Sequence, residues 1–207
     1  MMSEIMSQFK EVPTTCISDA LKGLNTMDFS LKPLQEHYKI AGRAFTVKMP
    51  PGENLAVLRA IREARPGEIL VIDAQGDTCR AIAGDFIIGM AQTMGLAGIV
   101  VDGAIRDILG IKALDFPVFC KGTTVAAGSK HARGEIDVPI SCGGTVVCPG
   151  DLIVGDVDGV VVIPQACEEE ILKKSLDKLI KDQERSERIS GNPDNVRKYL
   201  DDLIDDH

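Results

Sequence analysis

The chain has 207 residues, of which 31 are acidic and 23 basic, and its formal net charge of −8 argues against a nucleic-acid surface, which needs clustered Lys and Arg. A content of 44% hydrophobic and 26% charged residues is typical of a globular domain. No apolar run approaches the ~20 residues that cross a bilayer, and the first residues lack a basic segment and cleavage site. We therefore expect a single cytoplasmic domain over residues 1–207, with neither a nucleic acid nor a membrane as a partner.

The first part of the chain alternates between expected helices and strands. In order, these are helices at 3–10 and 16–22 (the N-terminal helices within 1–23, the second capped by Thr14 or Thr15), strand 39–49, a helix capped by Asn54, strand 68–73, turn 74–77, helix about 80–94, strand 98–101, helix 105–113 and strand 116–120. Within this part, strand 68–73, helix 80–94 and strand 98–101 are expected to form a right-handed βαβ unit with two parallel strands.

The later part changes character. Gly, Pro and Asp turns separate expected strands near 134–140, 144–148, 152–155 and 160–163. A C-terminal helical tail over 166–207 follows, with a helix from about 166 to 188 and a shorter one after Asn192-Pro193. Alternating elements followed by a run of strands predict a compact α/β domain with layered sheets.

Three charged residues flank the two central strands. Asp85 lies near the start of the expected helix 80–94, and Arg106-Asp107 follow strand 98–101. In a βαβ unit these positions share the sheet edge at which open α/β proteins bind ligands. A structural role is the alternative for each: Asp85 on a solvated helix face, Arg106 as a surface cation, Asp107 as an acid favoured at a helix start. Spacing alone leaves both interpretations open.

Familiar cofactor motifs are absent from the sequence. There is no G-x-G-x-x-G after a strand, no G-x-x-x-x-G-K-[ST] and no G-x-S-x-G, so nicotinamide, ATP and serine-hydrolase chemistry are not first choices. The six cysteines form no C-x-x-C pair and the three histidines are unpaired, which favours reduced thiols over a zinc site. Lys48 and Lys121 are candidates for a Schiff base, but surface lysines are the stronger interpretation.

The chain resembles the family that joins RraA, the regulator of ribonuclease activity, to the class II 4-hydroxy-4-methyl-2-oxoglutarate aldolases. The resemblance covers nearly all of residues 12–166. The motifs that carry it are Ile17-Ser-Asp-Ala-Leu21, Ala41-Gly-Arg-Ala-Phe-Thr46, Asn54, Arg65-Pro-Gly67, Gly84-Asp85, Gly98-Ile-Val-Val-Asp-Gly-Ala-Ile-Arg-Asp107, Phe116-Pro-Val-Phe119, Val138-Pro139, Pro149-Gly-Asp151 and Asp158-Gly-Val-Val-Val-Ile-Pro164.

This resemblance implies a swivelling β/β/α domain with layered sheets and C-terminal helices. It also implies a homo-oligomer, a trimer or hexamer, with active sites between subunits. The aldolases of the family carry the pattern D-x20-R-D-x-x-(E/D). Asp85, Arg106 and Asp107 match its first three positions, whereas the fourth, an acid that helps to order water around the metal, falls on Gly110.

The chemistry of a small 2-oxo acid substrate suits these residues. Its carboxylate and keto oxygen are hard ligands for Mg²⁺ or Mn²⁺, and we expect Asp107 to anchor that metal. Arg106 is expected to grip the keto oxygen or carboxylate, and Asp85 to hold the water that protonates the pyruvate enolate. Backbone N–H groups near a helix start are expected to bind the substrate carboxylate, in the segment Gly84, Asp85, Phe86, Ile87 and Ile88.

The expected activity is therefore that of a divalent-metal-dependent carbon–carbon lyase that releases pyruvate and decarboxylates oxaloacetate through the same enolate. The alternative is a non-catalytic protein that inhibits an endoribonuclease through its acidic surface. The intact pair Arg106-Asp107 favours the enzyme, whereas Gly110 favours the inhibitor.

Overall fold

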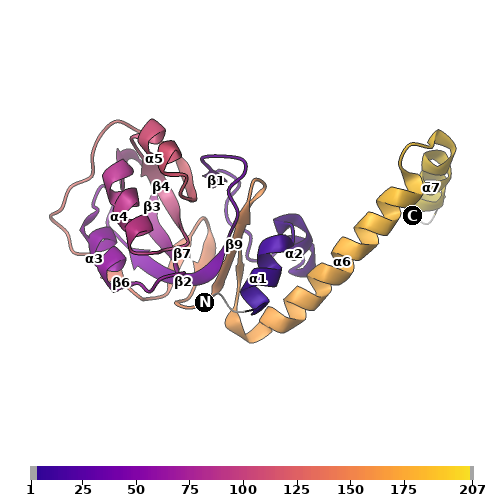
Figure 1. Cartoon of the computed structure of the whole chain (residues 1–207), viewed down its shortest axis with the longest axis horizontal. Helices are drawn as coiled ribbons and strands as arrows, with labels where there is room; N and C mark the ends of the chain where they lie inside the picture. Colours follow the sequence, from indigo (N-terminus) through magenta and orange to yellow (C-terminus); the bar gives the residue numbers. More distant parts are fainter. Residues whose placement is uncertain (1–3, 206–207) are drawn as a thin grey trace.

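Four parallel strands form the centre of the molecule in the computed structural model, which describes residues 4–205 (Figure 1). They lie in the order β5 (Val118–Thr123), β4 (Gly98–Ile105), β3 (Ile69–Ala81) and β2 (Ile40–Lys48). All eight residues of β4 are buried, as expected for a central parallel strand covered on both faces.

Antiparallel strands extend both edges of this sheet. They are β1 (Lys32–Pro33) on β5, and β6 (Glu135–Ile136) and β9 (Leu152–Asp156) on β2, with β10 (Gly159–Ile163) on β9. A separate hairpin consists of β7 (Ile140–Cys142) and β8 (Thr145–Val147). The fold is thus α/β with layered sheets, as predicted.

Three helices cover one face of the parallel strands: α3 (Leu55–Glu63), α4 (Asp85–Thr93) and α5 (Ile108–Leu114) (Figure 1). Their buried residues, such as Val57 and Ile61 of α3 and Ile88 of α4, recur at the three- and four-residue spacing of an amphipathic helix. They pack on every second residue of the strands, such as Ile99 and Val101 of β4. The opposite face packs against β7, β8, β9 and β10.

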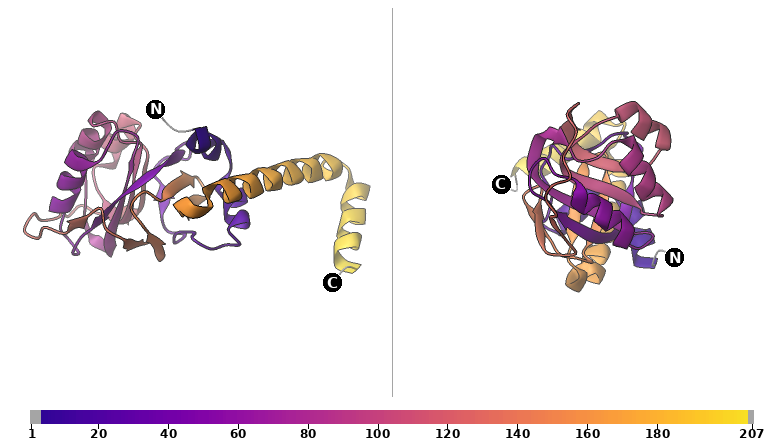
Figure 2. Two further views of the ribbon diagram at one scale, coloured as in Figure 1. Left: turned by 90° about the horizontal axis from the view of Figure 1, so that it is seen from below. Right: turned by 90° about the vertical axis from the view of Figure 1, so that its left-hand side faces the viewer.

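The terminal helices form a third apolar cluster on β9 and β10, in which Phe9, Ile17 and Leu172 are buried. These helices are α1 (Glu4–Glu11), α2 (Thr14–Ala20) and α6 (Glu168–Ile189), which follows a short 3-10 turn, η1 (Gln165–Cys167). Arg43 of β2 pairs with Glu168, Nη2 to Oε2 at 3.0 Å, and so fixes the start of α6. From there α6 extends away from the sheets, and α7 (Pro193–Asp205) lies at its far end (Figures 1 and 2).

The structure confirms the order of the predicted helices and strands but corrects several boundaries. The predicted turn 74–77 is a bulge within β3, where Gln75 and Gly76 have positive φ and the register to β4 shifts. Because β3 continues to Ala81, the predicted helix 80–94 begins only at Asp85. Strand 98–101 continues to Ile105, and the predicted strand 134–140 is the two short strands β6 and β7.

The predicted helix starts also need correction. The second N-terminal helix begins at Thr14 with Pro13 at its N-cap, so neither Thr14 nor Thr15 caps it. Asn54 does occupy the N-cap position of α3, but its side chain makes no capping hydrogen bond. Residue 3, the expected start of the first helix, lies outside the described residues. None of the helices in residues 4–205 combines the length and hydropathy that crossing a bilayer requires.

Candidate active site

The loops after β3 and β4 are tied together, and this brings the predicted residues to one place. The N–H of Ile82 donates to the Ala104 carbonyl at 2.9 Å, and the N–H of Arg106 donates to the Ala83 carbonyl at 3.0 Å. Asp85 then begins α4, and Asp107 is the N-cap residue of α5. The two acids and the arginine therefore lie at the C-terminal edge of neighbouring parallel strands.

A cavity of about 220 Å³ lies at this edge. Six of the seven predicted site residues line it, and Asp107, the expected metal ligand, is among them. They are Gly84, Asp85, Phe86, Ile87, Arg106 and Asp107. Ile88, the remaining predicted position, is fully buried in the core between α4 and the sheet and does not line the cavity.

Arg106 and Asp107 interact directly. Nε of Arg106 lies 3.3 Å from Oδ2 of Asp107, and both side chains are a little over two-fifths exposed. Asp107 has φ 59° and ψ 42°, a left-handed conformation that non-glycine residues adopt at a cost of roughly 1–2 kcal/mol. Such strain persists only where the surrounding structure imposes it and is enriched at functional sites.

The start of α4 presents backbone donors to the same cavity. The first three N–H groups of a helix lack helical partners, and here they belong to Asp85, Phe86 and Ile87. The N–H of Phe86 donates to Oδ1 of Asp85 at 2.7 Å. The N–H of Ile88 donates to the Gly84 carbonyl at 3.0 Å, so this amide belongs to the helix and is not available to a ligand. Of the predicted segment 84–88, Ile88 therefore offers no free backbone N–H to the cavity.

Two further polar residues, Asn54 and Lys130, also line the cavity. The sequence analysis did not identify them as site residues. Asn54 is 6% exposed, and its Oδ1 is buried without a hydrogen-bond partner among residues 4–205. An unpaired buried amide oxygen is costly, which favours a ligand or water at this point. The Asn54 N–H donates to the Ser129 carbonyl at 2.9 Å, and this bond holds the loop that carries Lys130 against α3.

Lys48 and Lys121 lie elsewhere. Neither lines the cavity. Nζ of Lys121 is 2.6 Å from Oδ1 of Asp102, and this hydrogen-bonded ion pair raises the pKa of Lys121, which disfavours the neutral amine that a Schiff base needs. Lys48 is half exposed, with Nζ 3.6 Å from Oε1 of Glu135. All six cysteines are free, and three of them are buried.

The donors at the cavity suit a hard, hydrated cation. Within residues 4–205 no group of three or more His, Cys, Asp or Glu side chains is placed to hold a metal. That composition does not fit zinc, which takes three or four such ligands. It fits Mg²⁺ or Mn²⁺, which are held by one or two carboxylates and keep several waters. Asp107 and Asp85 are the carboxylates that line the cavity.

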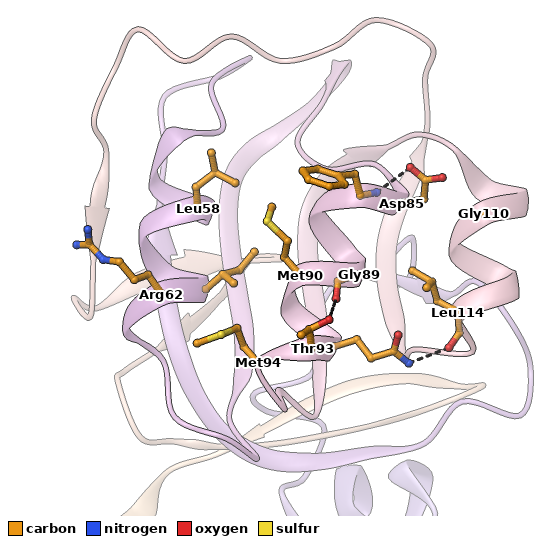
Figure 3. A pocket seen from close by; sticks show the side chains of 12 residues that line it. Leu58, Arg62, Asp85, Gly89, Met90, Thr93, Met94, Gly110 and Leu114 are labelled. Atoms are coloured by element: carbon orange, nitrogen blue, oxygen red, sulfur yellow. Dashed lines mark hydrogen bonds between the residues drawn. The ribbon is translucent and has the colours of Figure 1, made fainter.

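A larger apolar groove of about 750 Å³ adjoins the cavity, because Asp85 and Phe86 line both. Figure 3 shows Leu58 and Arg62 of α3 on one side and Leu114 of α5 on the other, with Met90 of α4 and Met94, which follows this helix, between them. Phe86 is 77% exposed, and Leu109 at the start of α5 is 85% exposed. Apolar surface of this kind around a polar site is typical of an interaction face.

Known proteins with similar sequences and structures bear on this site. The family model described as "RraA-like: Aldolase/RraA" matches residues 14–162. A protein of Halalkalibacterium halodurans that carries the provisional name of a 4-hydroxy-4-methyl-2-oxoglutarate aldolase is 55% identical over 201 residues, covering 97% of this chain and 96% of that protein. A Thermus thermophilus protein named 4-hydroxy-4-methyl-2-oxoglutarate aldolase is 28% identical over 155 residues, or 75% of this chain and 94% of its own length.

Among solved structures, Streptomyces coelicolor RraAS2 is similar with a TM-score of 0.80 and 32% identity, over 91% of this chain and 99% of that one. Its description is that of an unusual member of the RNase ES inhibitor RraA protein family. Because the family model spans most of the chain and a relative of nearly equal extent is 55% identical, the chain belongs to the RraA-like family of aldolases and RraA proteins.

Proposed function

We propose that this protein is a divalent-metal-dependent class II aldolase that cleaves 4-hydroxy-4-methyl-2-oxoglutarate or a related 2-oxo acid to release pyruvate. The observation that carries the proposal is the convergence of Asp85, Arg106, Asp107 and the first amides of α4 on one cavity. The aldolase names of two relatives support the same reaction class. Decarboxylation of oxaloacetate is the expected second activity, since both reactions pass through the pyruvate enolate.

The metal, Mg²⁺ or Mn²⁺, supplies Lewis-acid polarisation of the keto oxygen when it is bound. In this proposal Asp107 holds it, largely through water. Arg106 binds the keto oxygen or carboxylate with its planar fork and stabilises the negative charge that develops as the carbon–carbon bond breaks. Arg106 lines the cavity, and its Nε lies 3.3 Å from Oδ2 of Asp107, which supports this role.

The remaining polar groups have distinct roles in the proposal. The amides of Asp85 and Ile87 at the start of α4 bind the substrate carboxylate. Asp85 holds the water that delivers a proton to the methylene carbon of the enolate and so completes pyruvate. The buried, unpaired Oδ1 of Asn54 accepts a hydrogen bond from a substrate hydroxyl or from an ordered water.

The proposed active form is a homo-oligomer, a trimer or hexamer. The exposed apolar side chains beside the cavity, Phe86 and Leu109, together with the groove over α4, support a subunit contact at this face.

A second candidate function is inhibition of an endoribonuclease. The similarity to a solved RraA-type protein at 32% identity supports it, as does the net charge of −8. An inhibitor of this kind acts through its surface and does not need an arginine and two acids gathered at one cavity.

Steady-state pyruvate release separates the two candidates. An aldolase releases pyruvate from 4-hydroxy-4-methyl-2-oxoglutarate and from oxaloacetate, and Arg106→Ala abolishes both activities while the chain stays folded. The inhibitor would be supported if the wild-type protein released no pyruvate from either compound and inhibited endoribonuclease cleavage. Its Arg106→Ala variant should then inhibit cleavage as well.

A further inference from the structure

Two glycines lie against the two carboxylates of the candidate site, and each glycine belongs to the opposite helix. Gly84 immediately precedes α4 and faces Asp107, the N-cap residue of α5. Gly110 lies in the first turn of α5 and faces Asp85, the first residue of α4. Figure 3 shows Asp85 beside Gly110. The arrangement is therefore reciprocal.

Backbone conformation does not explain either glycine. Gly84 has φ −121° and ψ −173°, an extended conformation that any residue adopts. Gly110 is inside α5 and does not have a positive φ, and at such a position glycine is less favourable than alanine. A reason for glycine must therefore come from the neighbouring side chains.

The space that a side chain would occupy is already filled by the acids. A Cβ on Gly110 would overlap Oδ2 of Asp85 and lie 3.0 Å from its Cγ and 2.8 Å from its Cβ. A Cβ on Gly84 would overlap Oδ2 of Asp107 and lie 3.2 Å from its Cγ, and it would also lie 3.3 Å from Cγ of Arg106. Carbon atoms pack at about 3.5–4.0 Å, so both contacts are too close.

The two clashes would be relieved differently. Rotation about the side chain can carry the carboxylate of Asp107 away from a methyl group on residue 84, but it then leaves its present position. The Cβ of Asp85 does not move with rotation, so a methyl group on residue 110 has to shift Asp85 and the start of α4. In both cases the acid is displaced, whereas the core, which lies on the other side of these helices, is not touched.

We propose that Gly84 and Gly110 are positioning residues, Gly84 for the carboxylate of Asp107 and Gly110 for that of Asp85. The assignment of metal binding to Asp107 and of proton delivery to Asp85 rests on the proposed function, whereas the contacts do not. An acid at residue 110 would have to place its own Cβ in the space of Asp85. The glycine at this position is thus a condition for the present placement of Asp85.

The test compares Gly84→Ala and Gly110→Ala with Gly89→Ala, a matched control. Gly89 lies inside α4, and its added Cβ would meet only Leu114, at an ordinary 3.8–4.0 Å.

Mn²⁺ binding to each protein is measured by calorimetry, and hydrogen exchange at the pyruvate methyl group by NMR. Gly84→Ala should weaken Mn²⁺ binding about tenfold or more, as the loss of a ligand's support does. Gly110→Ala should leave Mn²⁺ affinity near wild type and slow exchange by about 100-fold, the effect of a misplaced catalytic group.

Gly89→Ala should match wild type in both measurements. If Gly84→Ala and Gly110→Ala also match wild type, the proposal is overturned. A wild-type protein that neither binds Mn²⁺ nor exchanges pyruvate hydrogens would instead defeat the proposed function.

Thermal unfolding tests the contact independently of any activity. Gly110→Ala should lower the melting temperature of the wild-type chain but raise it in an Asp85→Gly background, where the space is free and alanine favours the helix. An equal shift in both backgrounds would show that Gly110 is not coupled to Asp85 and would overturn the proposal whatever the function.

Discussion

Arg106 and Asp107 are adjacent in the chain, and their side chains turn toward each other, with Nε of Arg106 3.3 Å from Oδ2 of Asp107. Only these two residues separate the end of β4 at Ile105 from the start of α5 at Ile108, and the left-handed backbone of Asp107 makes the turn between strand and helix. Two residues that come from one strand end thus present opposite charges to one cavity. Their separate contributions can be distinguished by substitution.

Asp107→Asn should weaken Mg²⁺ or Mn²⁺ binding and lower turnover together, because it removes the charge that holds the cation in the proposed function. Arg106→Lys keeps the charge but loses the planar fork, so turnover should fall by about 100-fold or more while metal affinity stays near wild type. Calorimetric titration with Mn²⁺ and pyruvate-release assays on the same preparations measure both quantities. Parallel losses of metal affinity in the two variants would contradict these roles.

Asp85→Asn should spare pyruvate binding and slow protonation of the enolate. The measurement is the rate of hydrogen exchange at the pyruvate methyl group in deuterated water, together with a pyruvate binding titration. Ile87→Ala is a control at the same helix start, because it keeps the backbone N–H and both acids. Exchange at the wild-type rate in Asp85→Asn would remove Asp85 from the proposed proton path.

The pH dependence of stability should report Asp73 of β3. Burial raises the pKa of Asp73 above its ordinary value of 3.8. The unfolded chain therefore ionises this carboxyl at a lower pH than the folded chain does, and stability is lost as the pH rises above about 4. Asp73→Asn removes this penalty. It should raise the melting temperature at pH 7, and the gain should shrink as the pH falls toward 4.

Asp77→Asn is the matched control for that experiment. Asp77 lies on the same strand and accepts the Cys79 N–H at 2.8 Å, as Asp73 accepts the Gln75 N–H at 2.9 Å, but Asp77 is only partly buried. A pH-independent effect of Asp73→Asn would contradict the assignment to ionisation.

Light scattering should give a mass of three or more chains for the wild-type protein. Leu109→Asp puts a charge on the exposed apolar face beside the cavity and should shift the population toward smaller species. Val146→Asp, an equally drastic change on the separate hairpin, is the control. A fully active protein with the mass of one chain would contradict the proposed assembly.

The sequence predicted the central strands and the gathering of Asp85, Arg106 and Asp107, because burial on both faces leaves a clear apolar run such as Ile99–Val101. It missed the extension of β4 through Asp102 and Gly103, since this dipeptide is typical of a turn. In the structure Oδ2 of Asp102 accepts the Gly143 N–H at 2.8 Å and Oδ1 pairs with Lys121, so the carboxylate stays buried within the strand. Those partners are distant in sequence.

Contacts between segments that are distant in sequence also account for the site residues that the sequence analysis missed. Asn54 was predicted as a helix cap and was one of the residues that carry the family resemblance, but it was not predicted as a site residue, and Lys130 lay in a segment with no predicted role. The bond from the Asn54 N–H to the Ser129 carbonyl brings these two segments together, and no local pattern announces it. Gly84 was predicted only as part of the substrate-binding segment, and Gly110 only as the position where the family's acid is missing. Their contacts with the acids could not be predicted, because these depend on which acid lies opposite each glycine.

Metal dependence of pyruvate release is the most direct test of the central claim. The presence of Lys130 at the cavity makes a Schiff-base route the relevant competitor. The protein is stripped with EDTA, restored with Mg²⁺ or Mn²⁺, and assayed with oxaloacetate before and after borohydride treatment in the presence of pyruvate. The account predicts that activity is lost with EDTA, returns with either ion and survives borohydride. Two results together would contradict it. The activity of the wild-type protein would persist without metal and be destroyed by borohydride, and a covalent pyruvate adduct would form in the wild-type protein but not in Lys130→Met.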